Sequence, residues 1–173
     1  MRNVILSLLI VFSACGKNSS PKIADKQTDN NDKYSGVYEY VYPDNTSDLI
    51  ENHFIVFSIM DSKLTGYYYG TSDEFDDARE GYLPAFFVAK MDNLEIKGDS
   101  IKFTLKVDNS DFLTRAIDLK YKSTKGAINV GYKNWGNKIT TSPKNYNGLF
   151  KDSETIFFKG EQAFLDKTFK KKK

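Results

Sequence analysis

The sequence predicts a mainly β fold, an antiparallel meander barrel with one or two short helices, and a β-sandwich is the alternative. Three observations favour this class. Short β-prone runs separated by turn residues fill the chain from Tyr34 onward. Several of these runs alternate apolar and polar residues, which is typical of a half-buried strand. A Gly-Asp turn at residues 98–99 lies between two runs whose apolar residues match across the turn.

The first segment has the layout of a secretory signal peptide. Arg2 supplies a positive start, Val4–Phe12 is almost entirely apolar, and the small residues Ser13 and Ala14 follow. The apolar stretch is too short for a helix that crosses a bilayer of about 30 Å. We therefore expect residues 1–14 to be removed.

The one cysteine of the chain gives that segment a more specific meaning. Phe12-Ser13-Ala14-Cys15 resembles the bacterial lipobox, in which leucine usually occupies the position of Phe12. The resemblance implies lipidation of Cys15 and a membrane anchor in a bacterial cell envelope. Gly16 resembles the residue after the cysteine in lipoproteins that reach the outer membrane. The sequence does not decide which leaflet of the membrane holds the anchor. The alternative is an ordinary signal peptide followed by a chance cysteine.

A polar stretch separates the predicted anchor from the folded part. Residues 15–33 consist mainly of Lys, Asn, Asp, Ser and Gln, so they cannot bury enough surface to offset the entropy of ordering. We expect a lipidated cysteine with a disordered tether there, followed by a single β-rich domain over residues 34–173.

Three strands are expected at the start of the domain. Val37–Tyr42 alternates, with Tyr38, Tyr40 and Tyr42 on one face. His53–Met60 is apolar on both faces, as a strand covered on both sides would be. The Asp61-Ser62-Lys63 turn leads into Leu64–Tyr69, which completes a hairpin.

An acidic segment follows over residues 73–80. Its carboxylates suit Ca²⁺, but their spacing differs from that of an EF-hand loop. Thr71 and Glu74 have the spacing of a capping box and Gly81 is a suitable stop, so we favour a capped helical turn over a cation site.

The central hairpin is the clearest element. Leu83–Met91 is an apolar run with Pro84 at its start. Beyond it, a type II′ turn at Gly98-Asp99 pairs Ile96 with Ile101 and Leu94 with Phe103. The next strand then points Ile101, Phe103, Leu105 and Val107 inward and Lys102, Thr104 and Lys106 outward.

The rest of the chain predicts further strands and one helix. The strands are expected at Ala116–Tyr121, Asn147–Lys151, Thr155–Lys159 and Thr168–Lys171. Ser123 is a candidate N-cap for a helix that ends at Gly136. Its apolar face would consist of Ile128, Tyr132 and Trp135.

The start of the domain carries a weak family resemblance. Gly36-Val37-Tyr38 after a polar lead-in loosely resembles the Gly-x-Trp start of lipocalin-like barrels. The resemblance implies a meander barrel over the whole domain. Hardly any residue of the domain matches a motif of that family.

Composition excludes several function classes. The single cysteine and single histidine rule out disulfide scaffolds and sites built from several Cys or His ligands, and no cofactor or metal is expected. A net charge of +2 without a basic face argues against a nucleic-acid partner. His53 is the only candidate base that titrates near neutrality, and no Gly-x-Ser-x-Gly elbow accompanies it, so we assign no catalytic residue.

The tyrosines are the residue-level candidates for a binding site. Tyr67 and Tyr69 share one face of their strand, and Tyr68, which shares its face with Leu64, Gly66 and Gly70, is expected to point into the core. Tyr67, Tyr69, Tyr38 and Tyr40 would form an aromatic patch for a ligand, unless they are simply strand residues packed on a pleated surface.

These observations predict a lipid-anchored, monomeric envelope protein with a non-enzymatic binding role. The ligand would be a small apolar molecule, a carbohydrate or a peptide, held in a cavity of at least about 300 Å³. A filled barrel with an exposed aromatic patch would favour a protein–protein module instead, such as an inhibitor of an envelope hydrolase. A cleft that combines His53, a carboxylate and a hydroxyl would favour a hydrolase.

Overall fold

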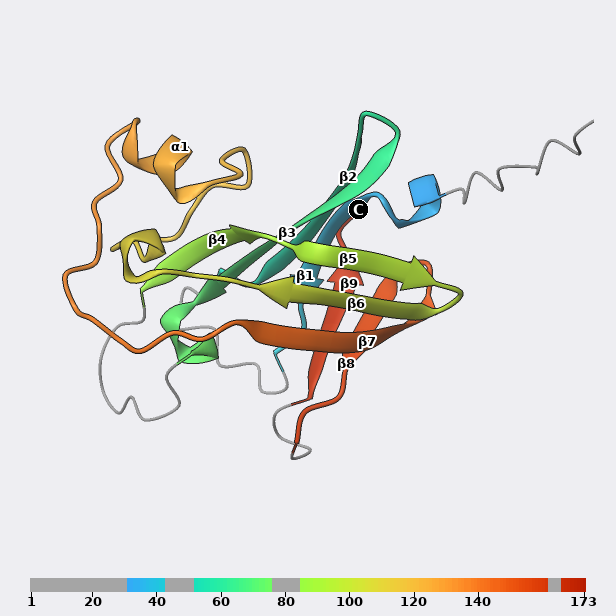
Figure 1. Ribbon diagram of the computed structural model, residues 1–173. Coiled ribbons are helices and arrows are strands. Elements are labelled where there is room, and N and C mark those ends of the chain that lie inside the picture. The colour runs from blue at the N-terminus through green and yellow to red at the C-terminus, as the bar shows by residue number, and fades with distance from the viewer. Residues whose placement is uncertain (1–30, 43–51, 76–84, 162–165) are drawn as a thin grey trace, which may run out of the picture.

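Nine antiparallel strands form a nearly closed barrel in the computed structural model (Figure 1). The structure describes residues 31–42, 52–75, 85–161 and 166–173. The predicted signal peptide, Cys15 and nearly all of the predicted tether lie outside these residues, as do Pro84 and most of the acidic segment.

The strands follow one another around the barrel, as the meander prediction requires. Their bounds are β1 Gly36–Tyr40, β2 Phe54–Met60, β3 Lys63–Thr71, β4 Phe86–Lys90, β5 Asp92–Lys97, β6 Ser100–Leu105, β7 Lys144–Asp152, β8 Thr155–Phe158 and β9 Lys167–Lys171. The helical elements are η1 Asn31–Tyr34, η2 Ser72–Glu74, η3 Asn109–Asp111 and α1 Thr124–Ile128.

The barrel closes through its two edge strands. The sheet order is β4-β3-β2-β1-β9-β8-β7-β6-β5, so β4 and β5 are the edges. These two strands are separated in the chain only by Met91, whose N–H donates to the carbonyl of Gly66 at 2.9 Å. One nearly continuous stretch therefore pairs with β3 through its first half and with β6 through its second half.

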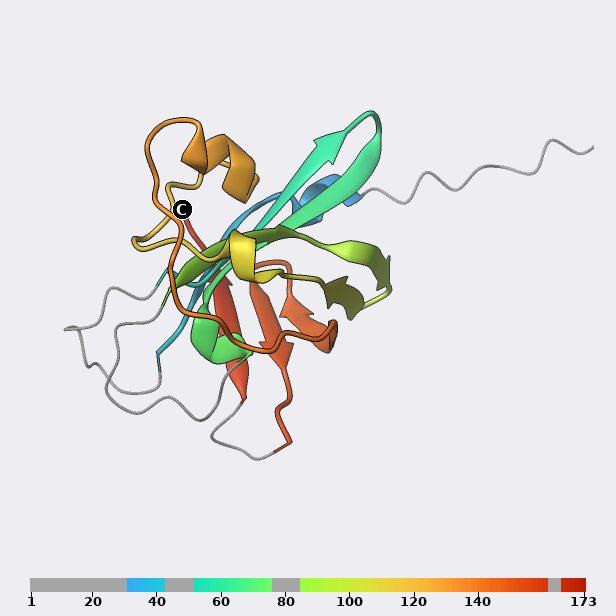
Figure 2. The same cartoon turned by 60° about the vertical axis from the view of Figure 1, so that its left-hand side comes forward.

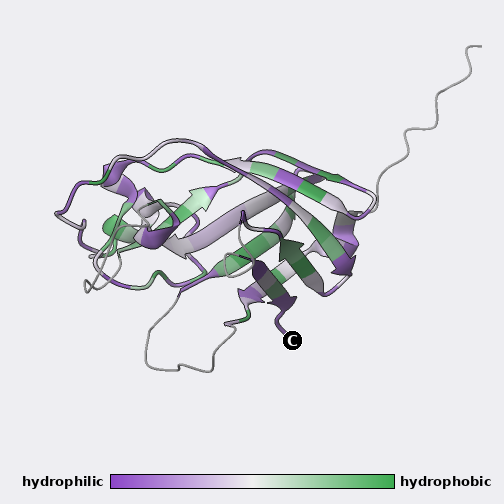
Figure 3. Ribbon diagram, turned by 90° about the horizontal axis from the view of Figure 1, so that it is seen from below, coloured by the Kyte–Doolittle hydropathy of each residue, from purple (hydrophilic) through white to green (hydrophobic). Residues whose placement is uncertain are grey.

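Aromatic side chains fill the interior, because every second residue of each strand points inward. Tyr38, Tyr68, Phe103, Phe150 and Phe169 are all almost completely buried in one core cluster. Green and purple bands alternate along several strands in Figure 3, which reflects the same alternation.

The hairpin at residues 98–99 confirms the turn prediction and corrects one pair. Gly98 has φ +56°, Ile96 pairs with Ile101, and Lys97 pairs with Ser100. The pairing then shifts between Asp92 and Glu95, so the predicted Leu94–Phe103 pair is not formed in register. A β-bulge causes this, since three steps along β5 match only two along β6.

A long excursion between β6 and β7 covers part of the outside of the barrel. We call residues 112–138 the covering segment. Val56, Tyr67, Tyr69 and Val88 on the outer face of the sheet pack against Leu113 and Ile117 of this segment. The sheet is therefore covered on both faces at β2 and β3, as the two-sided apolar pattern of β2 predicts.

Two predictions within the covering segment are wrong. Ala116–Tyr121 is not a strand, because these residues lie across the outer face of the sheet and do not extend it. The predicted helix is short: Ser123 does cap it, with Oγ accepting from the N–H of Gly126 at 3.1 Å, but α1 ends at Ile128. Its buried residues are Thr124 and Ala127, whereas Ile128 is exposed.

None of the helices in the described ranges has the length and apolar character needed to traverse a bilayer.

Candidate functional site

Glu74 is the centre of a buried polar cluster at one end of the barrel. It lies in η2, directly after β3, and its side chain is about 1% exposed. Even-numbered residues of β3, including Tyr68, face inward. Glu74 follows β3 at an even-numbered position, and its side chain also points inward. The chain therefore turns a carboxylate into the end of an otherwise aromatic interior.

Three side chains from three other strand positions donate to this carboxylate. The hydroxyl of Tyr68 donates to Oε1 at 2.8 Å, and that of Tyr146 donates to Oε2 at 2.6 Å. Lys167, at the start of β9, forms a hydrogen-bonded ion pair with Oε1. These contacts supply the partners that a buried charge requires.

Two further groups surround the carboxylate. Lys144 donates from Nζ to the backbone carbonyl of Glu74 at 2.7 Å and lies 3.9 Å from Oε2. His53 Nε2 lies 3.9 Å from Oε1 and 3.4 Å from Oγ1 of Thr71, while Nδ1 lies 3.2 Å from the hydroxyl of Tyr42.

The electrostatics of the cluster keep Glu74 ionised and His53 neutral. Burial alone would raise the pKa of Glu74, but the charge of Lys167, that of His53 and the hydrogen bonds from Lys167 and Tyr146 lower it to about 2. Burial lowers the pKa of His53 to about 4; Glu74 opposes this change and Lys167 adds to it. Near neutral pH the cluster thus holds a carboxylate beside a neutral imidazole.

The two tyrosines are fixed as hydrogen-bond donors. Burial and the neighbouring charge of Glu74 raise the pKa of Tyr68 and that of Tyr146 well above the ordinary value. Both phenols therefore keep their protons over the whole physiological range and donate them to Glu74.

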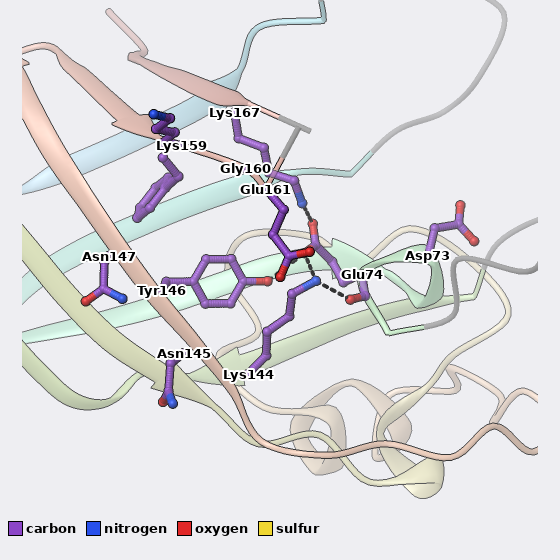
Figure 4. Close-up of a pocket in the computed structure, with 11 residues that line it drawn as sticks. Asp73, Glu74, Lys144, Asn145, Tyr146, Asn147, Lys159, Gly160, Glu161 and Lys167 are labelled. Carbon is purple, nitrogen blue, oxygen red and sulfur yellow. Dashed lines mark hydrogen bonds and ion pairs between the residues drawn. The ribbon is translucent and has the colours of Figure 1, made fainter. Parts of the chain in front are cut away.

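A cavity of about 450 Å³ opens beside this cluster (Figure 4). It lies where β7 diverges from β8, since the last pair between them is Gly148 with Phe158 and residues 144–147 of β7 extend beyond it. The lining residues are Asp73, Glu74, Lys144, Asn145, Tyr146, Asn147, Phe158, Lys159, Gly160, Glu161 and Lys167.

The cavity is lined by charged and amide groups, and aromatic side chains form one wall. Figure 4 shows the ends of Lys144, Tyr146 and Lys167 converging on Glu74, with Glu161 beside them. The ammonium, amide and carboxylate groups around it can donate and accept hydrogen bonds, and the ring of Phe158 supplies an apolar surface. Such a site suits a small polar molecule.

The structure does not bring the four predicted tyrosines together. Tyr67 and Tyr69 share the outer face of β3, as predicted, but they are only 8% and 0% exposed. The expectation that they are open to a partner is wrong, because the covering segment packs over them. The hydroxyl of Tyr69 donates to the carbonyls of Leu119 and Tyr121 at 3.0 and 2.8 Å.

Tyr38 and Tyr40 lie on the opposite, inner face of the sheet. Tyr38 is fully buried, and its hydroxyl donates to the carbonyls of Tyr34 and Ser153. Tyr40 packs against Phe169 and against His53, next to the polar cluster. Tyr68 is buried in the core, as predicted.

The capping box predicted for Thr71 and Glu74 is not formed. Thr71 makes no side-chain cap hydrogen bond, and η2 is a single 3-10 turn. Glu74 instead points into the barrel, where Tyr68, Tyr146 and Lys167 donate to its carboxylate oxygens. Gly81 and the acidic residues after Phe75 lie outside the described residues.

The importance of Glu74, Tyr146 and Lys167 was missed at the level of sequence. One signal was available: Glu74 keeps the inward phase of Tyr68, and Lys167 keeps that of Phe169. The meeting of these residues depends on the register of β3, β7 and β9 around the barrel, which local patterns do not encode.

The cluster lacks the geometry of a catalytic triad. A triad histidine uses one ring nitrogen for the acid and the other for the nucleophile. Here Nε2 of His53 faces both Glu74 and Thr71, and Thr71 is only 2% exposed. Across the described ranges, no group of three His, Cys, Asp or Glu residues is placed to hold a metal ion.

Comparison with known proteins finds no match for this chain among protein-family models, curated proteins or solved structures.

Proposed function

We propose that this chain is a lipid-anchored protein of a bacterial cell envelope that binds a small polar ligand, a carbohydrate or a short peptide, without transforming it. The observation that carries the proposal is the cavity of about 450 Å³ beside the buried carboxyl group of Glu74 and its ion pair with Lys167. Its volume lies within the range of about 300–1,000 Å³ that is usual for small-molecule sites.

The filled interior favours a polar ligand over an apolar one. Large aromatic side chains occupy the barrel, and the cavity is lined mainly by charged and amide groups. An apolar ligand would leave these groups without hydrogen-bond partners, which costs free energy. A sugar or peptide can pair with them and still pack on Phe158.

The alternatives receive less support. A protein–protein module was expected to present an exposed aromatic patch, but each tyrosine within the described ranges is buried or half-buried. A hydrolase would need an accessible nucleophile beside His53, and Thr71 is buried. The lipobox around Cys15 is the support for the anchor and for the envelope location.

The test is a binding screen with the purified lipoprotein in detergent. Monosaccharides to trisaccharides and dipeptides to tetrapeptides are tested by thermal shift, and each hit is titrated by calorimetry. Asn147→Ala removes an exposed amide from the lining, and Lys125→Ala removes an exposed cation from α1, outside the cavity.

We expect a hit whose affinity falls about tenfold in Asn147→Ala, the effect of one lost hydrogen bond, and is unchanged in Lys125→Ala. The absence of any hit, or equal effects of the two variants, would contradict the proposal.

A further inference from the structure

The covering segment is strongly basic. Asp118 is its only acidic residue, and its basic residues are Arg115, Lys120, Lys122, Lys125, Lys133 and Lys138. Its six basic residues against one acidic residue give this segment a charge of +5, whereas the whole chain has a net charge of only +2; Lys170–Lys173 forms a second basic run. A patch of this kind attracts an anionic partner.

Most of these cations are available to a partner. All six basic side chains are exposed. Lys120 pairs with Asp118 at 3.3 Å, whereas Lys125 and Lys133 have no ion pair within the residues that the structure describes. Arg115 and Lys122 lie over the rings of Tyr132 and Tyr67, which leaves their charge in place.

Two branched apolar side chains protrude from the same segment. Ala127 of α1 is fully buried and packs in the cluster on the outer face of the sheet, whereas Ile128 and Val130 close to it are exposed. Ile128 is 36% exposed and Val130 is 55% exposed. Apolar tips surrounded by lysines are typical of surfaces that insert shallowly into anionic membranes.

The arrangement of the molecule places this tip on the side where the chain enters the barrel. In Figures 1 and 2, α1 and the tip of the β2–β3 hairpin both rise on the upper side, and η1 lies there too. The hairpin tip also exposes apolar residues, since Ile59 and Met60 are 41% and 47% exposed. A flat lipid surface can therefore meet both projections on the upper side of the barrel in Figure 1.

We propose that the covering segment docks on an anionic lipid bilayer, with Val130 and Ile128 inserted between headgroups and the surrounding lysines paired with lipid phosphates. The docking goes beyond ligand binding, and it does not depend on the cavity or on lipidation of Cys15. Its consequence is a fixed orientation of the barrel on the membrane, which a lipid anchor alone would not provide.

The test uses the chain from Gly16 to Lys173, which contains every strand of the barrel and no cysteine. Val130→Cys carries a single environment-sensitive nitrobenzoxadiazole label. Leu149→Cys is the matched control, because Leu149 is 52% exposed on β7. Vesicles contain either phosphatidylcholine alone or one part phosphatidylglycerol to two parts phosphatidylcholine.

We expect the label at residue 130 to brighten and shift to the blue with the anionic vesicles only, and the label at residue 149 to stay unchanged. Lys125→Glu with Lys133→Glu should weaken partitioning at least about tenfold, whereas Lys102→Glu with Lys159→Glu, on other parts of the surface, should weaken it much less. Thermal melts show that each variant folds.

Three outcomes overturn the proposal: equal responses at both labels, an equal response to both vesicle types, or no partitioning at all. The last outcome would favour an acidic protein surface, and not a lipid bilayer, as the partner of these lysines. None of these outcomes bears on the sugar and peptide screen, so the two proposals fail separately.

Discussion

His53 and Glu74 make the stability of this protein sensitive to acid. The pKa of His53 is about 4 in the folded chain because burial disfavours the imidazolium, whereas the ordinary value is 6.5. Between pH 4 and 6.5, His53 is therefore mostly protonated in the unfolded chain and mostly neutral in the folded chain. As the pH falls from 6.5 to 4, this difference should remove about 3 kcal/mol of stability.

Glu74 acts in the same direction at lower pH. Its pKa is about 2 in the folded chain against an ordinary value of 4.5, so its contribution is complete above 4.5 and declines toward pH 2. Urea unfolding at a series of pH values measures both effects. His53→Gln should flatten the curve between pH 6.5 and 4, and an unchanged slope would show that His53 titrates normally.

Tyr146 allows the strength of the hydrogen bonds to Glu74 to be measured. Tyr146→Phe removes a donor to a buried carboxylate and should cost about 1.5–3 kcal/mol of unfolding free energy. Tyr34→Phe is the control, because its hydroxyl donates to the neutral carbonyl of Gly98 and should cost only about 0.5–1.5 kcal/mol. Equal losses in urea unfolding would argue against a charged acceptor.

At the scale of elements, β6 is a half-buried strand with one face in the core. Phe103 is 2% exposed and contacts Tyr146 and Phe158, so Phe103→Ala should cost about 3–5 kcal/mol. Thr104 faces outward and its hydroxyl donates to Oδ1 of Asn145 at 2.8 Å in an exposed hydrogen bond, so Thr104→Ala should cost less than about 1 kcal/mol. Similar losses in the two variants would mean that β6 is not half-buried with Phe103 on its inner face.

Elements with a strong local pattern could be predicted from the sequence. The alternation of Ile101, Phe103 and Leu105 and the turn at Gly98 agree with each other, and both are confirmed. The covering segment could not be predicted in this way. Ile117 and Leu119 have the spacing of strand residues, but their partners are Tyr69 and its neighbours on a distant strand, and that contact sets their conformation.

At the scale of the whole molecule, the meander order was predictable but the polar cluster was not. Consecutive hairpins and short loops predict neighbours around a barrel. They do not say which inward residues meet across the interior. Tyr68, Tyr146 and Lys167 converge on Glu74 only because the barrel closes with one particular register.

The membrane anchor is a prediction about the whole molecule. Cys15→Ser should abolish labelling by a radioactive fatty acid and remove the lipid anchor, so that the variant is recovered in the soluble fraction or is only peripherally bound and released by salt. Ser13→Thr leaves the cysteine in place and serves as a control for expression. Absence of lipid in the wild-type protein would refute the lipobox interpretation.

The end of the barrel is organised around the carboxylate of Glu74, which is buried and stays ionised. The most direct test is an NMR titration of protein labelled with ¹³C at the glutamate carboxyls, with Glu74→Gln used to assign the signal of Glu74. We predict that the Glu74 signal keeps the chemical shift of a carboxylate over the pH range in which the exposed glutamates titrate. The midpoint of Glu74 itself is expected at about pH 2. A midpoint near the ordinary value of 4.5 would contradict a Glu74 carboxylate that Lys167 and the tyrosine hydroxyls keep ionised.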